Sequence, residues 1–257
     1  MLQQERLHRI QALLRHLEHL STERIMAELQ ISRETARRDM IELEHLRIAQ
    51  RVHGGIVSIA SVNVEAPLHI RNTQHSKQKR AIAKAAVQQL SAGQTVFIDA
   101  GSSTAILAEE LRYFSGLTIL TNSLQVALNL NIANEVQQQH EIILLGGHIG
   151  QGAYTKGGLV IAEIQRYRAD FALVSAVGVS AQHGASSFDA EEARIAQTMM
   201  QQSQQLILLA DHSKLDIVSR VQFAKTHEIS MLITDQQAAE TQLKHYRQSI
   251  AALIVAG

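Results

Sequence analysis

Residues 32–40 read Ser-Arg-Glu-Thr-Ala-Arg-Arg-Asp-Met, and this stretch has the pattern of a helix with an exposed cationic face. Ser32 is a good N-cap, and Ala36 then begins an apolar face that continues at three- and four-residue spacing. Arg33 and Arg37, one turn apart, share the outward face at the positive N-terminal end of the helix. A recognition helix presents its N-terminal residues to base edges in the major groove, so the stretch predicts a DNA-reading helix.

The segments on both sides of this helix fit a winged helix-turn-helix. Apolar residues recur at helical spacing over residues 2–17, which predicts a first helix, and Ser21 can cap a short second helix. After the cationic helix, residues 48–59 predict a β-hairpin whose turn is His53-Gly54-Gly55. Three helices followed by a hairpin predict a winged helix-turn-helix DNA-binding domain over residues 1–58.

Arginine, hydroxyl and histidine side chains of this unit are the candidate DNA contacts. Arginine suits planar, bidentate contacts with phosphates and guanine edges, and no lysine occurs before Lys77. Serine and threonine hydroxyls, with the free N–H groups at a helix start, can hold phosphates. The alternative is a solvated arginine face with partners on the same helix, such as Arg38 with Glu42. The expected DNA-binding residues are Ser32, Arg33, Thr35, Arg37, Arg38, Arg51 and His53.

A linker and a second domain follow the hairpin. Residues 59–75 hold the only proline and lack periodicity, which predicts a connection between domains. Over residues 76–257, runs that are apolar throughout alternate with helical stretches, which is typical of a parallel sheet covered on both faces. The predicted strands are 95–98, 117–120, 141–145, 171–175, 206–209, 231–233 and 250–255, and the predicted helices are 77–90, 104–113, 124–132, 190–202 and 236–246.

Small or polar residues follow four of the predicted strands, namely 95–98, 117–120, 141–145 and 206–209. Open α/β sheets bind ligands outside the carboxyl ends of their strands, and glycine with hydroxyl groups at a helix start suits a phosphate or carboxylate. Lys214 adds a cation, and Asp99 and Glu192 can accept hydrogen bonds from sugar hydroxyls. Any one of these residues alone is more often a helix cap, so the prediction rests on their convergence. The expected effector-binding residues are Asp99, Gly101, Ser102, Ser103, Thr104, Asn122, Ser123, Gly146, Gly147, Glu192 and Lys214.

Composition excludes several classes of protein. The chain has 257 residues, no cysteine, and 24 basic against 24 acidic side chains. The lack of cysteine excludes disulfides, zinc–thiolate sites, iron–sulfur clusters and thiol catalysis. There is no P-loop, no dinucleotide-binding glycine motif and no apolar run long enough to cross a bilayer. No pair among the 13 histidines has metal-ligand spacing with a carboxylate partner. We therefore expect a cytoplasmic protein with no cofactor, no metal and no membrane partner.

Both halves of the sequence resemble the DeoR family of bacterial transcriptional regulators. In the first half the match includes Thr35-x-Arg37-Arg38-Asp39 and Arg51-x-His53-Gly54-Gly55. In the second half it includes Asp99-x-Gly101-Ser102-Ser103-Thr104, Thr121-Asn122-Ser123-Leu124, Leu144-Leu145-Gly146-Gly147 and Asp211-His212-Ser213-Lys214. One departure is Leu215-Asp216 after the lysine, where the family usually has an aromatic residue and glycine, and it puts an acidic side chain near the expected anion site.

The resemblance implies an α/β effector domain similar in fold to ribose-5-phosphate isomerase and the coenzyme A transferases. Regulators of this family repress carbohydrate-use operons and respond to a phosphorylated sugar or sugar-like metabolite. The segment Phe188-Asp189-x-x-Glu192 is similar to members of the glycerol-phosphate-repressor type. Because one winged domain buries too little surface for tight operator binding, and operators are paired half-sites, we expect a homodimer or homotetramer held by the second domain.

Two other functions stay open at this point. A sugar-phosphate isomerase or transferase with an accessory DNA-binding domain would use Asp99, Glu192 and Lys214 as catalytic groups. A DNA reader joined to a sugar-phosphate pocket is already complete as a sensor without turnover, so we expect no enzyme. An architectural DNA-binding protein without a ligand has no need of four polar strand ends.

Overall fold

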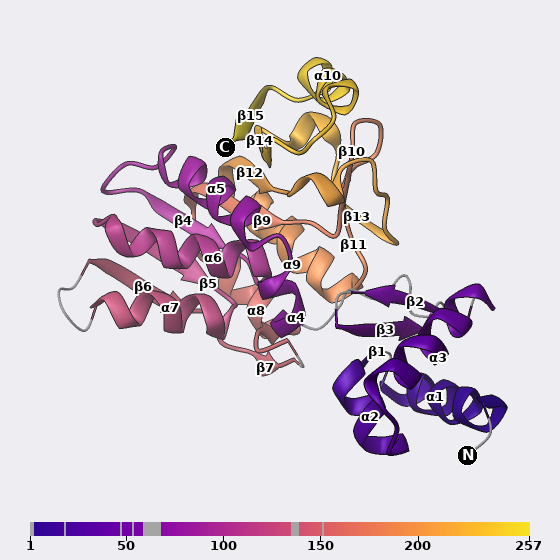
Figure 1. Cartoon of the computed structure of the whole chain (residues 1–257). Helices are drawn as coiled ribbons and strands as arrows, with labels where there is room; N and C mark the ends of the chain where they lie inside the picture. Colours follow the sequence, from indigo (N-terminus) through magenta and orange to yellow (C-terminus); the bar gives the residue numbers. More distant parts are fainter. Residues whose placement is uncertain are drawn as a thin grey trace. The chain divides into compact units, whose positions relative to one another are not determined.

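The structure is a computed structural model that describes residues 3–17, 19–46, 48–52, 54–58, 68–134, 139–150 and 152–257. Its contacts divide the chain into two units, Met1–Ala66 and Pro67–Gly257 (Figure 1). Each unit has a hydrophobic core of its own. Within the described residues, no helix is long and apolar enough to cross a membrane.

The described part of the first unit is a winged helix-turn-helix, as the sequence predicts. Its helices are α1 (Gln3–Leu17), α2 (Thr22–Leu29) and α3 (Arg33–His45), and its strands are β1 (His19–Ser21), β2 (Ala49–Val52) and β3 (Gly55–Ser58). The strands pair antiparallel in the order β1-β3-β2 (Figure 1). Helices and sheet together bury a core of aliphatic side chains: Leu7, Ile10, Leu14, Leu20, Ile25, Leu29, Ala36, Met40, Leu43, Ala49 and Ile56.

Strand β1 extends the predicted two-stranded hairpin to three strands. It pairs with β3 by placing Leu20 opposite Ile56 and Ser21 opposite Gly55. A Cβ atom on Gly55 would collide with the carbonyl oxygen of Leu20, so only glycine permits this close approach. Gly54 before it has a φ of +83°, which glycine adopts without strain. Three residues are too few for alternation to predict the strand.

The second unit is built on a parallel sheet in the order β15-β14-β12-β9-β4-β5-β6. Each strand overlaps a predicted one, so the predicted α/β class is confirmed. The bounds are β4 (Thr95–Ile98), β5 (Leu117–Thr121), β6 (His140–Leu144), β9 (Ala169–Ser175), β12 (Ser203–Leu209), β14 (Met231–Asp235) and β15 (Ala252–Ala256).

The strand order reverses at the centre of this sheet. The chain begins the sheet at β4 and runs outward through β5 to β6 at one edge. It then crosses to β9 on the other side of β4 and runs outward through β12 and β14 to β15. The carboxyl ends of β4 and β9 therefore flank a topological switch point, which is where open α/β sheets bind their ligands.

Helices cover both faces of the sheet (Figure 1). Side chains of α5 (Ser76–Val87), α6 (Ser102–Glu110) and α7 (Leu124–Asn134) pack with Val96 and Ile98 on one face. Side chains of α8 (Gly158–Ile164), α9 (Ala190–Gln201) and α10 (Glu240–Ser249) pack with Phe97 on the other. Successive residues of β4 thus point to opposite faces, and both faces are apolar because both are covered.

Some elements of the second unit are not predicted by the sequence. Strands β10 (Gly178–Ser180), β11 (Gly184–Ser187) and β13 (Val221–Ala224) form a small antiparallel sheet, and β7 (His148–Ile149) pairs with β8 (Thr155–Lys156). Short 3₁₀ turns lie at Leu111–Tyr113, His212–Lys214 and Thr226–Glu228.

Part of the predicted linker belongs to the second unit. Residues Leu68–Thr73 form helix α4, which contacts α6. The buried ammonium of Lys79 donates a hydrogen bond to the carbonyl oxygen of Arg71 at 2.6 Å and fixes α4 on α5. Residues 59–67 lie outside the described residues. The local sequence does not predict this helix, because it has only six residues and no strong apolar stripe. Packing against α5 and α6 stabilises it instead.

Candidate functional site

The turn between α2 and α3 sets the orientation of the candidate recognition helix. Gln30 ends α2 in the left-handed conformation, with a φ of 51°. Ser32 caps α3 and accepts a hydrogen bond from the Thr35 N–H at 3.2 Å, and the two hydroxyl oxygens lie 2.9 Å apart. Ala36 is buried in the core, as the sequence predicts. The first turn of α3 therefore presents two hydroxyls and its free N–H groups to solvent.

The arginines of α3 lie on its exposed side. Arg33 faces Glu23 of α2 at 3.5 Å, and Arg38 faces Glu34 at 3.4 Å, where the alternative of a solvated arginine face named Glu42. Within the described part of the chain, Arg37 has no ion-pair partner. Exposed pairs of this kind contribute little to stability, so their arginines remain available to phosphates and bases.

Asp39, in the middle of the same motif, points inward and not to the DNA-facing side. It is fully buried, and its carboxylate accepts hydrogen bonds from Arg6 of α1, at 2.6 Å from Nε and 2.9 Å from Nη2. The hydrogen bond to Asp39 stabilises the charged guanidinium and raises the pKa of Arg6. The pair holds the recognition helix on α1, a role that sequence reasoning missed because its partners are 33 residues apart.

The wing is tied to the recognition helix by a second ion pair. Arg51 of β2 donates from Nε to Glu44 of α3 at 2.6 Å, and its backbone N–H donates to the same carboxylate at 3.1 Å. These hydrogen bonds lower the pKa of Glu44. The guanidinium of Arg51 has further N–H groups that can reach a phosphate. His53 lies outside the described residues.

In the second unit, the candidate effector residues begin at the switch point. The carboxylate of Asp99, after β4, accepts hydrogen bonds from the Ser175 N–H at 3.2 and 3.3 Å and so joins β4 to β9. A Cβ on Gly101 would lie 2.1 Å from the Ser175 hydroxyl oxygen, so a larger residue there would displace that hydroxyl. Ser175 is a member of the site that the sequence does not predict.

The N-terminus of α6 is buried at this point. Ser102, Ser103 and Thr104 are all at most 2% exposed, and Gly101 provides no side-chain cap. The Thr104 hydroxyl donates to the carbonyl oxygen of Gly101 at 3.0 Å. The Ser103 hydroxyl is buried, with no hydrogen-bond partner among the described residues. Buried polar groups are nearly always paired, so this hydroxyl and the uncapped N–H groups form a place where a ligand oxygen can bind.

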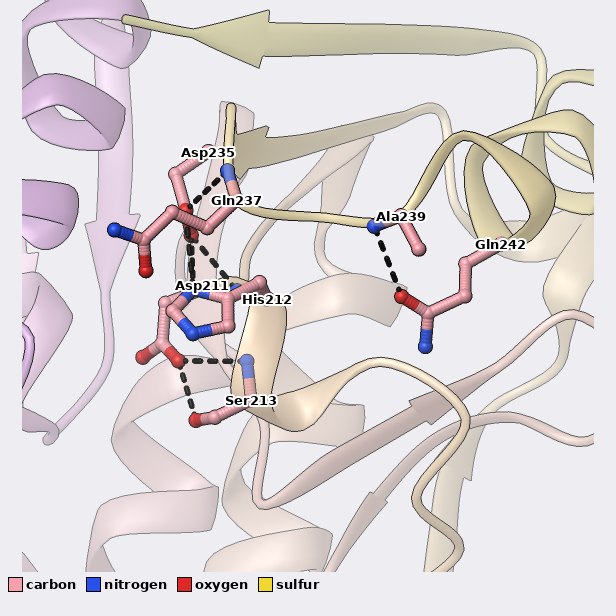
Figure 2. A network of polar contacts seen from close by, with 7 residues as sticks. All are labelled: Asp211, His212, Ser213, Asp235, Gln237, Ala239 and Gln242. Carbon is pink, nitrogen blue, oxygen red and sulfur yellow. Dashed lines mark hydrogen bonds and ion pairs between the residues drawn. The ribbon is translucent and has the colours of Figure 1, made fainter.

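Lys214 brings a positive charge to the carboxyl end of β9. It lies at the end of the 3₁₀ turn after β12, and its Nζ donates to the carbonyl oxygen of Ala176 at 2.6 Å, one residue past β9. Asp211 caps this turn by accepting from the Ser213 N–H at 3.1 Å and from its hydroxyl at 2.5 Å (Figure 2). The cap holds Lys214 beside the switch point.

The residues after β5 and β6 have mixed roles. Ser123 caps α7, and its hydroxyl accepts from the Val126 N–H at 3.2 Å. The Asn122 amide donates to a backbone carbonyl at 3.1 Å, while its amide oxygen is buried without a partner among the described residues. A Cβ on Gly147 would meet Val160 at 2.5 Å, whereas one on Gly146 would meet nothing within 4 Å. Packing therefore requires glycine at 147 but not at 146.

Glu192 lies in the first turn of α9 and faces Tyr154. Its carboxylate accepts from the Ser187 hydroxyl at 3.4 Å. Burial raises the pKa of Tyr154, and the negative charge of Glu192 raises it further. Tyr154 also forms an isolated antiparallel β-bridge with Ser123. Tyr154, which the sequence does not predict, therefore connects Glu192 to the residues that follow β5.

Asp216 does not approach the candidate anion site. Its φ of 61° lies in the left-handed region, which explains why glycine is usual in the related motif. Its carboxylate accepts from the Gln242 amide at 2.9 Å and lies 3.0 Å from the Tyr246 hydroxyl, both on α10. The acidic side chain that the sequence puts near Lys214 is thus directed to α10.

Two family models match the chain. The DeoR-like helix-turn-helix domain matches residues 6–62, and the DeoR C terminal sensor domain matches residues 74–236. The chain belongs to the DeoR family. It is a DNA-binding transcriptional regulator, and its relatives are regulators also.

Curated relatives of the DeoR-family chain align along most of their length. The HTH-type transcriptional repressor GlcR of Bacillus subtilis is 34% identical over 238 residues, which cover 92% of this chain and 90% of the relative. The glycerol-3-phosphate regulon repressor of Escherichia coli is 30% identical over 224 residues, 84% of each chain. Among solved structures, a ribose 5-phosphate isomerase of Methanocaldococcus jannaschii is similar over 55% of each chain, with a TM-score of 0.40 and 16% identity.

Proposed function

We propose that this DeoR-family protein represses a carbohydrate-use operon and releases its operator when a small phosphorylated sugar-like metabolite binds at the switch point of the second unit. The observation that carries the proposal is the buried, uncapped N-terminus of α6, with its unpartnered Ser103 hydroxyl. The names of two relatives, a repressor and a glycerol-3-phosphate regulon repressor, support the direction of control and the ligand class.

In this proposal the anionic group of the effector binds the start of α6. The backbone N–H groups of 101–104 and the Ser103 hydroxyl donate to phosphate oxygens, and Lys214 supplies the opposite charge. Glu192 and the Asn122 amide oxygen accept from sugar hydroxyls. Asp99 acts indirectly, because hydrogen bonds from Ser175 already occupy its carboxylate. The full proposed set is Asp99, Gly101, Ser102, Ser103, Thr104, Asn122, Ser123, Gly146, Gly147, Glu192 and Lys214.

On the DNA side, α3 enters the major groove and the wing contacts the backbone. Arg33 and Arg37 read base edges, while the Ser32 and Thr35 hydroxyls, Arg38, Arg51 and His53 hold phosphates. A homodimer or homotetramer, joined through the second unit, presents two such helices to paired half-sites. The protein performs this function in the cytoplasm.

An isomerase function is the second candidate, and the geometry of Asp99 opposes it. A general base needs a carboxylate that can reach the substrate proton, whereas the Asp99 carboxylate holds β4 to β9. The relatives of this protein named above are also transcriptional regulators.

The effector site is tested by Lys214→Met, with the exposed Lys244→Met as the matched control. Ligands are first found by thermal-shift screening of sugar phosphates, glycerol 3-phosphate included, and of their unphosphorylated counterparts. Loss of a charge-assisted hydrogen bond of about 1.5–3 kcal/mol should weaken ligand binding roughly 10- to 100-fold without weakening operator binding. Equal ligand-driven release of operator by the variant and wild type would place the pocket elsewhere. Steady isomerisation of the ligand, lost in Asp99→Asn, would establish the enzyme.

The DNA-reading assignment is tested by Arg37→Ala on an operator selected from random duplexes. A lost bidentate base contact should cost about 1–3 kcal/mol on the selected site and little on unrelated DNA. Arg51→Ala, by contrast, should weaken binding to all DNA and reduce the salt slope by about one unit, because it removes a phosphate contact. Arg166→Ala, an exposed arginine of the second unit, is the control. Undiminished operator affinity in a folded Arg33→Ala/Arg37→Ala variant would refute the assignment.

A further inference from the structure

Next to Lys214, two histidines and an aspartate come together from distant parts of the chain. His75 immediately precedes α5, whereas Asp211 and His212 immediately follow β12. One potential ligand atom from each of the three residues lies within 4.8 Å of the other two. The rings of His75 and His212 meet edge to face, with their centroids 5.0 Å apart.

Asp211 supplies a buried oxygen that no protein group uses. The residue is 1% exposed, and its Oδ1 accepts both hydrogen bonds from Ser213. Its Oδ2 is buried with no hydrogen-bond partner among the described residues. Burial by itself would raise the pKa of Asp211, but the Ser213 hydrogen bond and the charges of Lys214 and Lys79 outweigh burial and lower it. One oxygen of this buried side chain is therefore left for a ligand or cation.

His212 is oriented in the way that proteins orient a metal-binding imidazole. Its Nδ1 lies 3.0 and 3.1 Å from the two carboxylate oxygens of Asp235, which accept the ring proton (Figure 2). Asp235 is itself buried and is held by the N–H groups of Gln237, at 3.0 Å, and of His212, at 2.7 Å. This arrangement leaves the lone pair on Nε2, on the side of the Asp211 carboxylate in Figure 2.

His75 has a backbone conformation that helix formation alone does not require. Its φ of 51° lies in the left-handed region, and its side chain makes no cap hydrogen bond to α5 although it occupies the N-cap position. A non-glycine residue in this region is uncommon. Here the conformation directs the ring to His212.

We propose that His75, Asp211 and His212 bind one divalent transition-metal ion of the Zn²⁺ class. Two imidazoles and one carboxylate are a ligand set that Zn²⁺ accepts, with a fourth position open to water or another oxygen, whereas Mg²⁺ and Ca²⁺ prefer all-oxygen sites. In a tetrahedral site with bonds of about 2.0–2.1 Å the ligand atoms are about 3.3 Å apart, so the site must contract. The exposed side chain of His75 can supply that movement.

The neighbouring cations do not prevent binding. The ammonium groups of Lys79 and Lys214 donate to the carbonyl oxygens of Arg71 and Ala176, at 2.6 Å in each case. The carboxylates of Asp211 and Asp235 balance these two charges before any metal binds. The inference does not depend on the proposed effector or on repression, because it concerns the metal alone.

The test measures Zn²⁺ binding to the full chain after chelation and removal of the chelator. Titration calorimetry should show one Zn²⁺ per chain, and Mg²⁺ should not compete. His75→Asn keeps a residue that tolerates positive φ but removes the imidazole, and it should weaken binding by more than 100-fold. Asp235→Asn, which removes the negative charge and one of the two acceptor oxygens beside Nδ1 of His212, should weaken it about 10- to 100-fold. His245→Asn, an exposed histidine on α10, should bind Zn²⁺ as wild type does.

Two results overturn the inference. One is a wild-type chain that binds no Zn²⁺ at micromolar concentrations. The other is a His75→Asn variant with wild-type circular dichroism and wild-type Zn²⁺ affinity, since His75 is exposed and its loss leaves the core intact. A Co²⁺ absorption spectrum that changes in His75→Asn but not in His245→Asn would support direct ligation. Because no DNA or sugar enters the measurement, its failure is distinct from a failure of the proposed function.

Discussion

Removing the charge of Arg6 should unfold the DNA-binding unit at a much lower temperature than the rest of the chain. Arg6→Met keeps most of the aliphatic volume but removes both hydrogen bonds to Asp39, whose side chain is 1% exposed. Breaking a buried ion pair by removing one partner costs about 3–5 kcal/mol, because the other charge stays buried and unpaired. Arg6 itself is 16% exposed, so we expect the low end, about 3 kcal/mol.

That loss is large for a unit of this size. At about 0.05–0.15 kcal/mol per residue, a unit of roughly 60 residues has a free energy of unfolding of about 3–9 kcal/mol. At about 4–8 °C per kcal/mol, the Tm of the first unit should fall by about 12–24 °C. Operator binding should then be lost on warming, before the second unit unfolds.

The aromatic residues allow the two units to be followed separately in the full chain. All 4 tyrosines lie in the second unit, and the chain has no tryptophan, so tyrosine fluorescence reports only that unit. Far-ultraviolet circular dichroism reports the helices of both units. In Arg6→Met the dichroism should gain an early transition, while the tyrosine transition stays at its wild-type temperature.

Two further variants make this reasoning refutable. Arg24→Met removes an exposed arginine, 3.7 Å from Glu28, and should change little. Arg6→Met/Asp39→Leu removes the buried charge together with its partner and should recover much of the stability. If Arg6→Met melts like Arg24→Met, or if the double variant is less stable than Arg6→Met, the buried pair does not hold the unit together.

Two predictions concern the second unit. Tyr246→Phe removes a buried hydroxyl that donates to the Val179 carbonyl oxygen at 2.7 Å and accepts from the Asp216 N–H at 2.9 Å. Urea unfolding followed by circular dichroism should show that the free energy of unfolding falls by about 1–3 kcal/mol. Because the folded pKa of Asp211 lies below its ordinary value of 3.8, the unfolded state binds its proton first. The stability that this group contributes is therefore present above about pH 4 and lost as the pH falls through the folded pKa. Asp211→Asn should flatten the acid side of the stability profile, measured as the urea midpoint from about pH 2 to 5.

Sequence reasoning was accurate where burial is periodic. The apolar positions of α3 follow from Ser32 and Ala36, since the cap sets the start of the helix and the spacing sets its buried face. The parallel strands were predictable because their runs are apolar on both faces. Strands β1, β10 and β11 were missed because they are three or four residues long and two of them are rich in glycine and serine. Long-range pairing, rather than local pattern, stabilises them.

The types of residue at the candidate sites were predictable, but their partners were not. Spacing along a helix identifies pairs three or four residues apart, such as Arg38 with Glu34. It cannot show that Asp99 bonds to Ser175, 76 residues away, or that His75 meets Asp211. The Asp99 contact follows from the order of strands in the sheet, which places the carboxyl ends of β4 and β9 side by side. The His75 contact depends in addition on where α5 packs on the sheet, because His75 immediately precedes that helix. The periodicity of apolar residues along a helix or strand does not reveal the order of strands in the sheet.

The same order bears on the anion site that we propose at this edge. α6 is buried along almost its whole length, and its first N–H groups have no side-chain cap. A soluble domain ordinarily satisfies such groups, because each one left buried and unpaired lowers its stability. Here Gly101 stands where a capping serine or aspartate would satisfy them, and a Cβ at that place would collide with Ser175. In the function that we propose, an anionic ligand at this place takes the role of the cap and stabilises the folded second unit.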